Sequence, residues 1–303
     1  MVAAMLTSLD HLIVAVRDLD AASRQYQTLF GRHPSWRGSH PEAGTTNVLF
    51  RLDNTSIELL APTGDGPVAA LLTAWLDAHG EGLLGVAFGT ENLDEHCSLL
   101  ASRGLTPLAA EEGLGVDENS GAERRWRRAT LPLNRTRGVL MFPIEHLSAP
   151  EILPLAPLDG PDVAAAFALD HAVVQTNDAE AAKALFGETF GLRLALDKEF
   201  VQWDARFLFF RVGGVTLEVV AALGGQSSVE GLPASDTDRL YGATYKVRNA
   251  DAARARLAAS GVDVSEVRAG RRPGTRVFTV RNATCGVPTL MLEFDPENAQ
   301  PRS

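Results

Sequence analysis

Two histidine–glutamate pairs recur at one spacing along the chain. His11 and Glu58 lie 47 residues apart, and His171 and Glu218 lie the same distance apart. Each of the four falls in a run of apolar residues that is typical of a buried strand. A buried imidazole without hydrogen-bond partners costs about 1–3 kcal/mol, and an unpaired buried carboxylate costs more. We therefore expect each pair to face a polar pocket.

Such a pair could bind a metal or transfer a proton. Imidazole and carboxylate ligands together suit a hard or borderline divalent cation such as Mn, Fe, Ni, Co or Mg, whereas Zn usually takes more nitrogen or sulfur. The cation would polarise a substrate carbonyl, and a glutamate could move a proton from the neighbouring carbon. The alternative is structural, with His11 and His171 hydrogen-bonded to Glu58 and Glu218 as buried pairs.

The two pairs belong to a repeat that covers most of the chain. The second copy follows the first at an offset of 160 residues and keeps this register without net insertion. Two similar halves are therefore expected. The matched segments are Leu9-Asp10-His11 with Leu169-Asp170-His171, Phe30-Gly31 with Phe190-Gly191, Phe50-Arg51 with Phe210-Arg211, and Ile57-Glu58-Leu59 with Leu217-Glu218-Val219.

Each half contains two strand–helix units. Apolar strands begin near residues 9, 83, 169 and 240, and a helix that starts at Asp or Asn follows each of them. Two-residue turns at Asp53-Asn54 and Gly213-Gly214 indicate tight hairpins. Pro67 to His79 predicts an additional helix, and Gly224 to Arg239 predicts a loop. The glycines that end the four helices are Gly31, Gly104, Gly191 and Gly261.

Composition narrows the possible partners and the compartment. The chain has 303 residues, of which 45% are hydrophobic, and a net charge of −10 that would repel a nucleic-acid backbone. No apolar run approaches the ~20 residues of a membrane span, and no secretory signal is visible in Met1 to Ser8. Cys97 and Cys285 cannot form a disulfide framework or zinc knuckle. We expect a cytoplasmic monomer or homodimer that binds a small molecule, with no nucleic-acid or membrane partner.

A dense basic cluster runs from Arg124 to Arg128. In a strand, Arg124, Trp126 and Arg128 share one face, while Arg125 and Arg127 share the other. The cluster could be an anion clamp for a carboxylate, phosphate or glutathione-like substrate. The alternative interpretation is an exposed edge strand protected by its charges.

Several of these segments resemble the vicinal oxygen chelate superfamily, also called the glyoxalase, bleomycin resistance and dioxygenase superfamily. The resemblance covers nearly the whole chain and is specific for the fold, but the superfamily hosts several chemistries. The segments that carry it are Leu9–His11 and Leu169–His171, Ile57–Leu59 and Leu217–Val219, Gly80–Phe88, and Leu292–Pro296.

The resemblance implies an α+β fold of four βαβββ modules, paired into two glyoxalase-like domains with half-barrel cups. The first domain would cover residues 1–148, with modules at about 9–61 and 83–146. A proline-rich linker would follow at 149–166. The second domain would cover 167–303, with modules at about 169–221 and 240–296. Modules pair within a half in some members and across halves in others, and the sequence leaves both arrangements open.

The resemblance also implies a site. Carried over residue by residue, the metal ligands would be His11, Glu58 and Glu145 in the first half and His171, Glu218 and Glu293 in the second. The family's second histidine falls on Gly85 and Gly242, which have no side chain to donate, so a site without metal stays open. Catalytic roles fall to Glu58, Glu218 and Glu293. Substrate contacts are expected from Trp126, Arg128 and Tyr241.

These expectations converge on a glyoxalase-like lyase or isomerase. It would act on a small oxygenated metabolite by bidentate oxygen chelation and glutamate-assisted proton transfer, with or without a divalent metal. The alternatives are an extradiol ring-cleaving dioxygenase and a non-catalytic, antibiotic-type binding protein. The missing second histidine weakens the dioxygenase, because that chemistry in this superfamily uses two histidines and one carboxylate.

Overall fold

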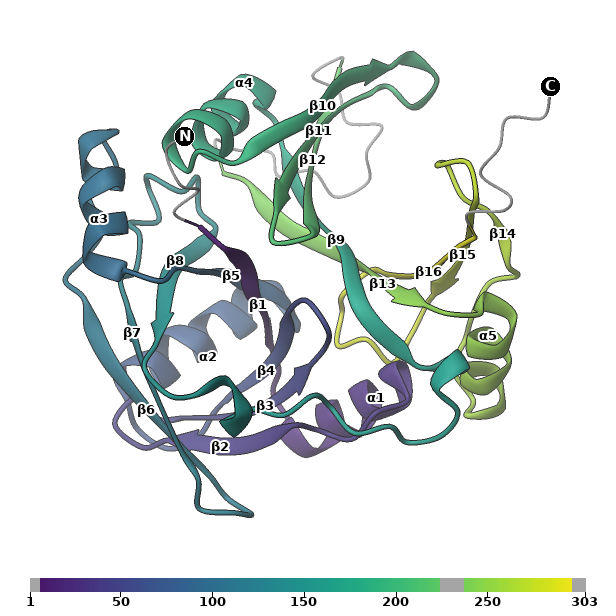
Figure 1. The fold of residues 1–303 in the computed structure, drawn as a ribbon, viewed down its shortest axis with the longest axis horizontal. Coiled ribbons are helices and arrows are strands. Elements are labelled where there is room, and N and C mark those ends of the chain that lie inside the picture. The colour runs from purple at the N-terminus through teal and green to yellow at the C-terminus, as the bar shows by residue number, and fades with distance from the viewer. Residues whose placement is uncertain (1–5, 224–236, 296–303) are drawn as a thin grey trace.

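The computed structural model describes residues 6–223 and 237–295, and it folds as two eight-stranded sheets with helices around them (Figure 1). The expected loop at 224–239 lies mostly outside the described residues. Within them, no helix is long and apolar enough to span a bilayer. The α+β class that the resemblance implied is confirmed by the two sheets and their helices.

The first half forms a closed barrel with the strand order β1-β4-β3-β2-β6-β7-β8-β5. Its helices are α1 (Leu19–Phe30), α2 (Pro67–His79) and α3 (Leu93–Ser102). Its strands are β1 (Ser8–Ala15), β2 (Trp36–His40), β3 (Thr45–Arg51), β4 (Ser56–Pro62), β5 (Gly82–Gly89), β6 (Glu111–Asp117), β7 (Glu123–Arg128) and β8 (Leu140–His146).

The second half forms a curled sheet with the order β10-β11-β12-β9-β13-β16-β15-β14. Its helices are α4 (Ala179–Lys183), which continues as the π-helical turn η3 (Ala184–Thr189), and α5 (Ala250–Ala259). Its strands are β9 (Ala166–Thr176), β10 (Arg193–Phe200), β11 (Ala205–Val212), β12 (Val215–Ala222), β13 (Arg239–Val247), β14 (Arg268–Ala269), β15 (Thr275–Val280) and β16 (Thr289–Phe294).

The modules pair within each half. In the first half, β1 runs antiparallel to β5, and in the second half β9 runs antiparallel to β13. A short additional contact between β2 and β6, at Gly38 with Asp117 and Ser39 with Val116, closes the first sheet into a barrel. Across the described residues, β10 and β14 each pair with a single strand, so the second sheet stays open.

The helix boundaries follow from capping chemistry. The Asp18 side chain accepts the backbone N–H of Ala21, and the Asn92 side chain accepts that of Glu95, so each satisfies an amide left unpaired at a helix start. The four predicted stop glycines adopt positive φ angles between 64° and 84°. Such a conformation is strained for residues with a Cβ atom, which explains why each helix ends on glycine.

The two faces of the barrel sheet pack into separate cores. On β1, Leu12 and Val14 point outward into a hydrophobic core that both halves share. Phe30 and Tyr245 meet in this core at a ring-centroid distance of 4.8 Å. Ile13 lies between Leu12 and Val14 in the sequence and points the other way, so it packs inside the barrel against Phe142. The alternation of β1 therefore places His11 on the inner side of the barrel.

The segment between the sheets is ordered along the first half. It contains the short 3₁₀ turns η1 (Pro150–Ile152) and η2 (Asp162–Ala164). The buried Arg32 side chain donates hydrogen bonds to the carbonyl oxygens of Ala156 at 2.7 Å and Ala166 at 2.6 Å. This segment is thus anchored to the first half, and the domain limits at 148 and 167 stay a prediction.

Candidate functional site

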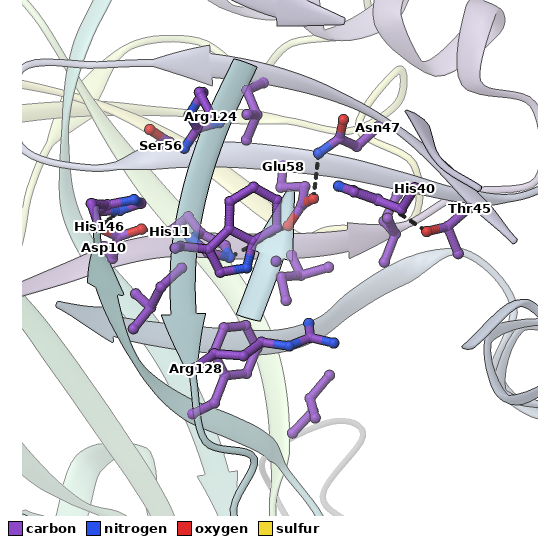
Figure 2. Close-up of a pocket in the computed structure, with 18 of the residues that line it drawn as sticks. Asp10, His11, His40, Thr45, Asn47, Ser56, Glu58, Arg124, Arg128 and His146 are labelled. Carbon is purple, nitrogen blue, oxygen red and sulfur yellow. Dashed lines mark hydrogen bonds and ion pairs between the residues drawn. The ribbon is translucent and has the colours of Figure 1, made fainter. Parts of the chain in front are cut away.

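A cavity of about 1150 Å³ occupies the interior of the first barrel. Figure 2 shows labelled polar side chains from several strands gathered around it. A volume of this size suits a small organic ligand. The polar residues that line it and carry its chemistry are His11, His40, Asn47, Glu58, Arg124 and Arg128.

His11 and Glu58 meet in this cavity because β1 and β4 are neighbours. The two strands are parallel, and Ile13 lies opposite Glu58 in their register. The Nε2 atom of His11 is 3.4 Å from an Oε2 atom of Glu58, and both residues are 9% exposed. The structure therefore brings the first predicted pair together in a pocket.

Asp10 fixes the orientation of the His11 ring. The Nδ1 atom of His11 donates to Asp10 Oδ1 at 2.7 Å, and His146 Nε2 donates to the other carboxylate oxygen at 2.8 Å. The His11 ring therefore presents Nε2 to Glu58 and the cavity. An imidazole held in this way by a carboxylate is a usual arrangement for proton transfer.

Asn47 fixes the carboxylate of Glu58. Its side-chain amide donates to Glu58 Oε1 at 2.7 Å, while Oε2 stays on the side of His11. The hydrogen bond directs one oxygen into β3 and leaves the other turned toward the cavity. Such an arrangement positions a general base without neutralising it.

The pocket shifts the pKa values of its ionisable groups in opposite directions. Burial opposes the charged form of His11, but the hydrogen bond to Asp10 and the charge of Glu58 raise its pKa above the ordinary value. Burial disfavours the ionised form of Asp10, but its hydrogen bonds to His11 and His146 lower its pKa strongly. Burial lowers the pKa of His40, so a neutral imidazole stands across from Glu58.

Arg124 lies near two indole rings. Its guanidinium carbon is 5.3 Å from the Trp36 ring centroid and 6.0 Å from that of Trp126. The indoles fit because the strands beneath them carry glycine. A Cβ on Gly113 would lie 2.2 Å from the Trp126 ring, and one on Gly38 would lie 2.5 Å from Trp36. Glycine in the barrel wall thus leaves the space that lets two aromatic rings lie next to a cation.

The basic strand that carries this arginine lies inside the sheet. β7 pairs with β6 on one side and with β8 on the other, so the edge-strand interpretation of the cluster is wrong. The alternation along β7 directs Arg124, Trp126 and Arg128 to the cavity, where all three are lining residues. Arg127 points outward and forms a bidentate ion pair with Asp94 at 2.8 and 3.0 Å.

Glu145 does not join His11 and Glu58. Its carboxylate accepts the backbone N–H of Leu93 at 3.2 Å, at the start of α3, and lies 3.6 Å from Arg127. Glu293 has the same role in the second half, since it accepts the N–H of Ala250 at 2.7 Å at the start of α5. Placing either glutamate among metal ligands is therefore wrong, because both stabilise a helix N-terminus on the outer face.

The donor set does not fit a divalent cation held by protein side chains. In the described ranges, no group of three or more His, Cys, Asp or Glu side chains has the arrangement to bind one. The position expected for a second histidine is sterically closed. A Cβ on Gly85 would lie 2.9 Å from the Leu140 carbonyl oxygen, and one on Gly242 would lie 2.6 Å from that of Pro288. Of the three residues expected as ligands in the first half, only His11 and Glu58 meet in the barrel.

The second half repeats the acid–histidine–acid arrangement in a different setting. His171 donates from Nδ1 to Asp170 at 2.9 Å, and its Nε2 is 3.6 Å from Glu218. The same Nε2 lies 2.9 Å from the Thr244 hydroxyl. Burial raises the pKa of Glu218, which favours its protonated form. Lys246 lies 3.4 Å from Asp170.

Aromatic side chains cover the inner face around this second arrangement. Phe207 packs with Ala205 and Val220, and Trp203 stacks on Phe200 at a centroid distance of 4.8 Å. Arg271, from the loop after β14, lies over the Trp203 ring at 3.9 Å. Tyr241, expected to contact substrate, is on β13 and does not line the barrel cavity.

The sequence analysis gave no role in the site to four of the polar residues that line the cavity, although the sequence contained a signal for one of them. Asp10 belongs to the repeated Leu-Asp-His segment, and Asp170 repeats it, so the repeat itself marked the acid beside each histidine. Asn47, His40 and His146 had no such marker. The second half carries Phe207 at the offset position of Asn47, which hides the role of Asn47 from any comparison of the two copies.

Comparison with known proteins agrees with this fold. Residues 9–168 match the family model of the glyoxalase-like domain, and residues 170–279 match that of the Glyoxalase/Bleomycin resistance protein/Dioxygenase superfamily. The 4-hydroxymandelate synthase of Streptomyces coelicolor, solved as a mutant, superposes with a TM-score of 0.67 over 98% of this chain and 94% of its own. Sequence identity in that superposition is 13%, so the likeness concerns the fold.

Curated relatives match shorter segments. The ethylmalonyl-CoA/methylmalonyl-CoA epimerase of Cereibacter sphaeroides is 41% identical over 69 residues, which cover 22% of this chain and 52% of that protein. The mitochondrial methylmalonyl-CoA epimerase of Homo sapiens is 30% identical over 109 residues, which cover 36% of this chain and 60% of that protein. The chain thus spans little more than half the length of these relatives.

Proposed function

The chain belongs to the glyoxalase/bleomycin resistance protein/dioxygenase superfamily, and from that premise we propose that its N-terminal barrel is an isomerase or lyase site. The reaction would transfer a proton at a carbon next to a carbonyl group of a small oxygenated metabolite. The observation that carries this proposal is the position of Glu58. It is a buried carboxylate with one oxygen held by Asn47 and the other turned toward His11 and the cavity.

Glu58 would act as the general base. It would take the proton from the carbon, and the electron pair of the broken C–H bond would move onto the carbonyl oxygen to give an enolate. His11 lies beside Glu58 with a raised pKa, so its Nε2–H can donate to that oxygen. Return of the proton to the same carbon, or to a neighbouring atom, would complete the isomerisation.

A protein-held metal is not part of this proposal. Of the expected ligands, His11 and Glu58 meet in the cavity, whereas Glu145 binds the start of α3. Gly85, where the family has its second histidine, has no space for a side chain. Positive charge at the developing enolate would instead come from the imidazolium of His11. Arg124 and Arg128 of β7 lie in the same cavity and add to the positive potential.

Hydrogen–deuterium exchange tests this proposal without requiring the physiological substrate. The protein would be incubated in D2O with compounds that carry an acidic C–H next to a carbonyl, beginning with methylmalonyl-CoA, and loss of the C–H signal would be followed by proton NMR. Wild type is expected to catalyse exchange with at least one compound, before and after dialysis against EDTA. Glu58→Gln is expected to lower the rate by a factor on the order of 100 or more.

Other outcomes would point to other functions. A wild-type exchange rate in Glu58→Gln would show that Glu58 is not the general base. Loss of exchange after EDTA treatment would contradict the inference that the reaction needs no metal. Tight binding of panel compounds with no exchange in wild type would favour a binding protein. Oxygen consumption with a catechol would favour the ring-cleaving dioxygenase.

A further inference from the structure

The lining of the barrel cavity divides into a polar wall and an apolar wall. Strands β2, β3, β4 and β7 contribute the polar wall, which contains His40, Asn47, Glu58 and Arg124. Strands β1, β5 and β8, which are neighbours on the other side of the barrel, contribute the apolar wall. Its buried members include Ile13, Phe142 and Ile144. The same strands also carry the polar group of Asp10, His11 and His146. A ligand that fills this cavity must therefore have a polar part for the polar wall and an apolar part for the apolar wall.

Helix α2 extends the apolar wall. Leu72 and Leu76 of this helix pack on Ala15 of β1, with Trp75 and Leu84 against them. A backbone hydrogen bond of 3.0 Å holds the helix to the barrel. The N–H of Ala69 donates it to the carbonyl oxygen of Ala43, in the turn after β2. Leu71, at 72% exposure, lies on the cavity lining as well, so apolar surface continues toward the outside.

The arginines of the cavity differ in the polar partners that they have among the described residues. Three arginines line the cavity. Arg51 donates to the Pro150 carbonyl oxygen at 2.8 Å, and Arg128 is 3.5 Å from Glu111. In the described part of the chain, Arg124 makes neither an ion pair nor a side-chain hydrogen bond, and its guanidinium lies near the two indole rings. Its N–H groups are therefore available to a ligand.

The charges around Arg124 favour an anion of low charge. The carboxylates of Asp10 and Glu58 are close enough to raise the pKa of Arg124, against the stronger lowering effect of burial. These two acids would repel a dianionic phosphate more strongly than a monoanionic carboxylate. The planar fork of a guanidinium also matches the two oxygens of a carboxylate.

We infer that the barrel binds an amphiphilic monocarboxylate, with its carboxylate on Arg124 next to Trp126 and its apolar body along Ile13, Phe142 and α2. This substrate class rests on the proposed function, because it names what Glu58 would act on. A carboxylate on Arg124 places the adjoining carbons between the guanidinium and Glu58. The apolar body contributes affinity, and the head group sets the orientation.

Binding of unreactive carboxylates tests the inference apart from the chemistry. Affinities of acetate, butanoate and hexanoate would be measured by isothermal titration calorimetry, with the fluorescence of the flanking tryptophans as a second readout. Each buried methylene is expected to strengthen binding about three- to fourfold, so hexanoate should bind about tenfold more tightly than butanoate. Hexanol and hexyl phosphate, matched in tail, are expected to bind at least about tenfold more weakly than hexanoate.

Matched variants separate the head-group contact from general damage. Arg124→Gln is expected to weaken hexanoate binding at least about tenfold, and Arg124→Lys is expected to retain part of it. Arg125→Gln, on the outward face of the same strand where Arg125 pairs with Glu123 at 3.0 Å, is the control that keeps it. Circular dichroism and thermal melting would establish that each variant folds. Equal affinities along the chain series, unchanged affinity in Arg124→Gln, or a preference for hexyl phosphate would each overturn the inference.

The two proposals fail in distinguishable ways. Hexanoate binding that survives in Glu58→Gln while exchange is absent from wild type would contradict the proposed reaction and support the ligand class. Exchange on a compound without a carboxylate, together with no affinity for hexanoate, would support the reaction and overturn the ligand class.

Discussion

The two halves carry the same three polar residues in different surroundings. Asp10, His11 and Glu58 correspond to Asp170, His171 and Glu218 at the offset of 160 residues. In the first half they face a cavity inside a closed barrel, and in the second half they lie on an open sheet among aromatic rings. A shared arrangement of side chains therefore does not imply a shared function, since the surroundings determine which atoms can reach a ligand.

Two replacements account for much of the difference. His11 lies opposite Ala87 across the β1–β5 pair, whereas His171 lies opposite Thr244, whose hydroxyl is 2.9 Å from Nε2. Asn47, which holds Glu58, is replaced by Phe207 in the second half. The first half thus leaves an imidazole nitrogen directed at an oriented carboxylate, while the second half occupies that nitrogen.

The Ala87 position offers a way to make the first half resemble the second. Ala87→Thr would place a hydroxyl opposite His11 and is expected to lower the exchange rate about tenfold, because the hydroxyl would compete for Nε2. Ala87→Val is the matched control, since valine has nearly the same shape and no hydroxyl. NMR-detected exchange in D2O would compare them, and equal rates in the two variants would contradict the role given to this nitrogen.

A smaller effect, on stability alone, is expected on α3. His96 is fully buried and neither ring nitrogen has a hydrogen-bond partner within the described residues, while Ala253 occupies the equivalent position of α5. Burial lowers the pKa of His96 from 6.5 to about 4. The unfolded chain therefore binds a proton at a higher pH than the folded one, and stability is lost as the pH falls from 6.5 to 4.

His96→Ala removes this contribution and gives the first half the residue of the second. The loss of stability between pH 7 and pH 4 is expected to be smaller in the variant than in wild type, by about 3 kcal/mol at most. Urea unfolding at several pH values between 4 and 7 would measure it. Parallel pH profiles for the two proteins would show that His96 does not titrate on unfolding in this range.

The repeat made the fold predictable. Each copy contains its own strands, capping residues and stop glycines, so local signals such as Asp18 and Gly31 fix the helices without knowledge of the rest. The approach of His11 to Glu58 followed from the same reasoning. Closure of the barrel did not, because it depends on Gly38 and Ser39 meeting residues about 80 positions away in the chain.

Two errors share a physical cause. The sequence does not reveal which face of a strand is turned inward, because that depends on distant pairing partners, which for β8 are β5 and β7. Glu145 therefore looked like a ligand although it faces the start of α3. Likewise, whether the Arg124–Arg128 strand lies at an edge depends on β6 and β8, which are distant pairing partners.

The most direct measurement compares two matched variants for proton exchange. Glu58→Gln and Glu218→Gln make the same change in equivalent positions, and the exchange rate of each would be measured by proton NMR in D2O with the same compound. If the first barrel is the reactive site, Glu58→Gln should lose activity by a factor on the order of 100 or more and Glu218→Gln should stay within about threefold of wild type. The opposite ranking would place the reaction in the second half and contradict this account.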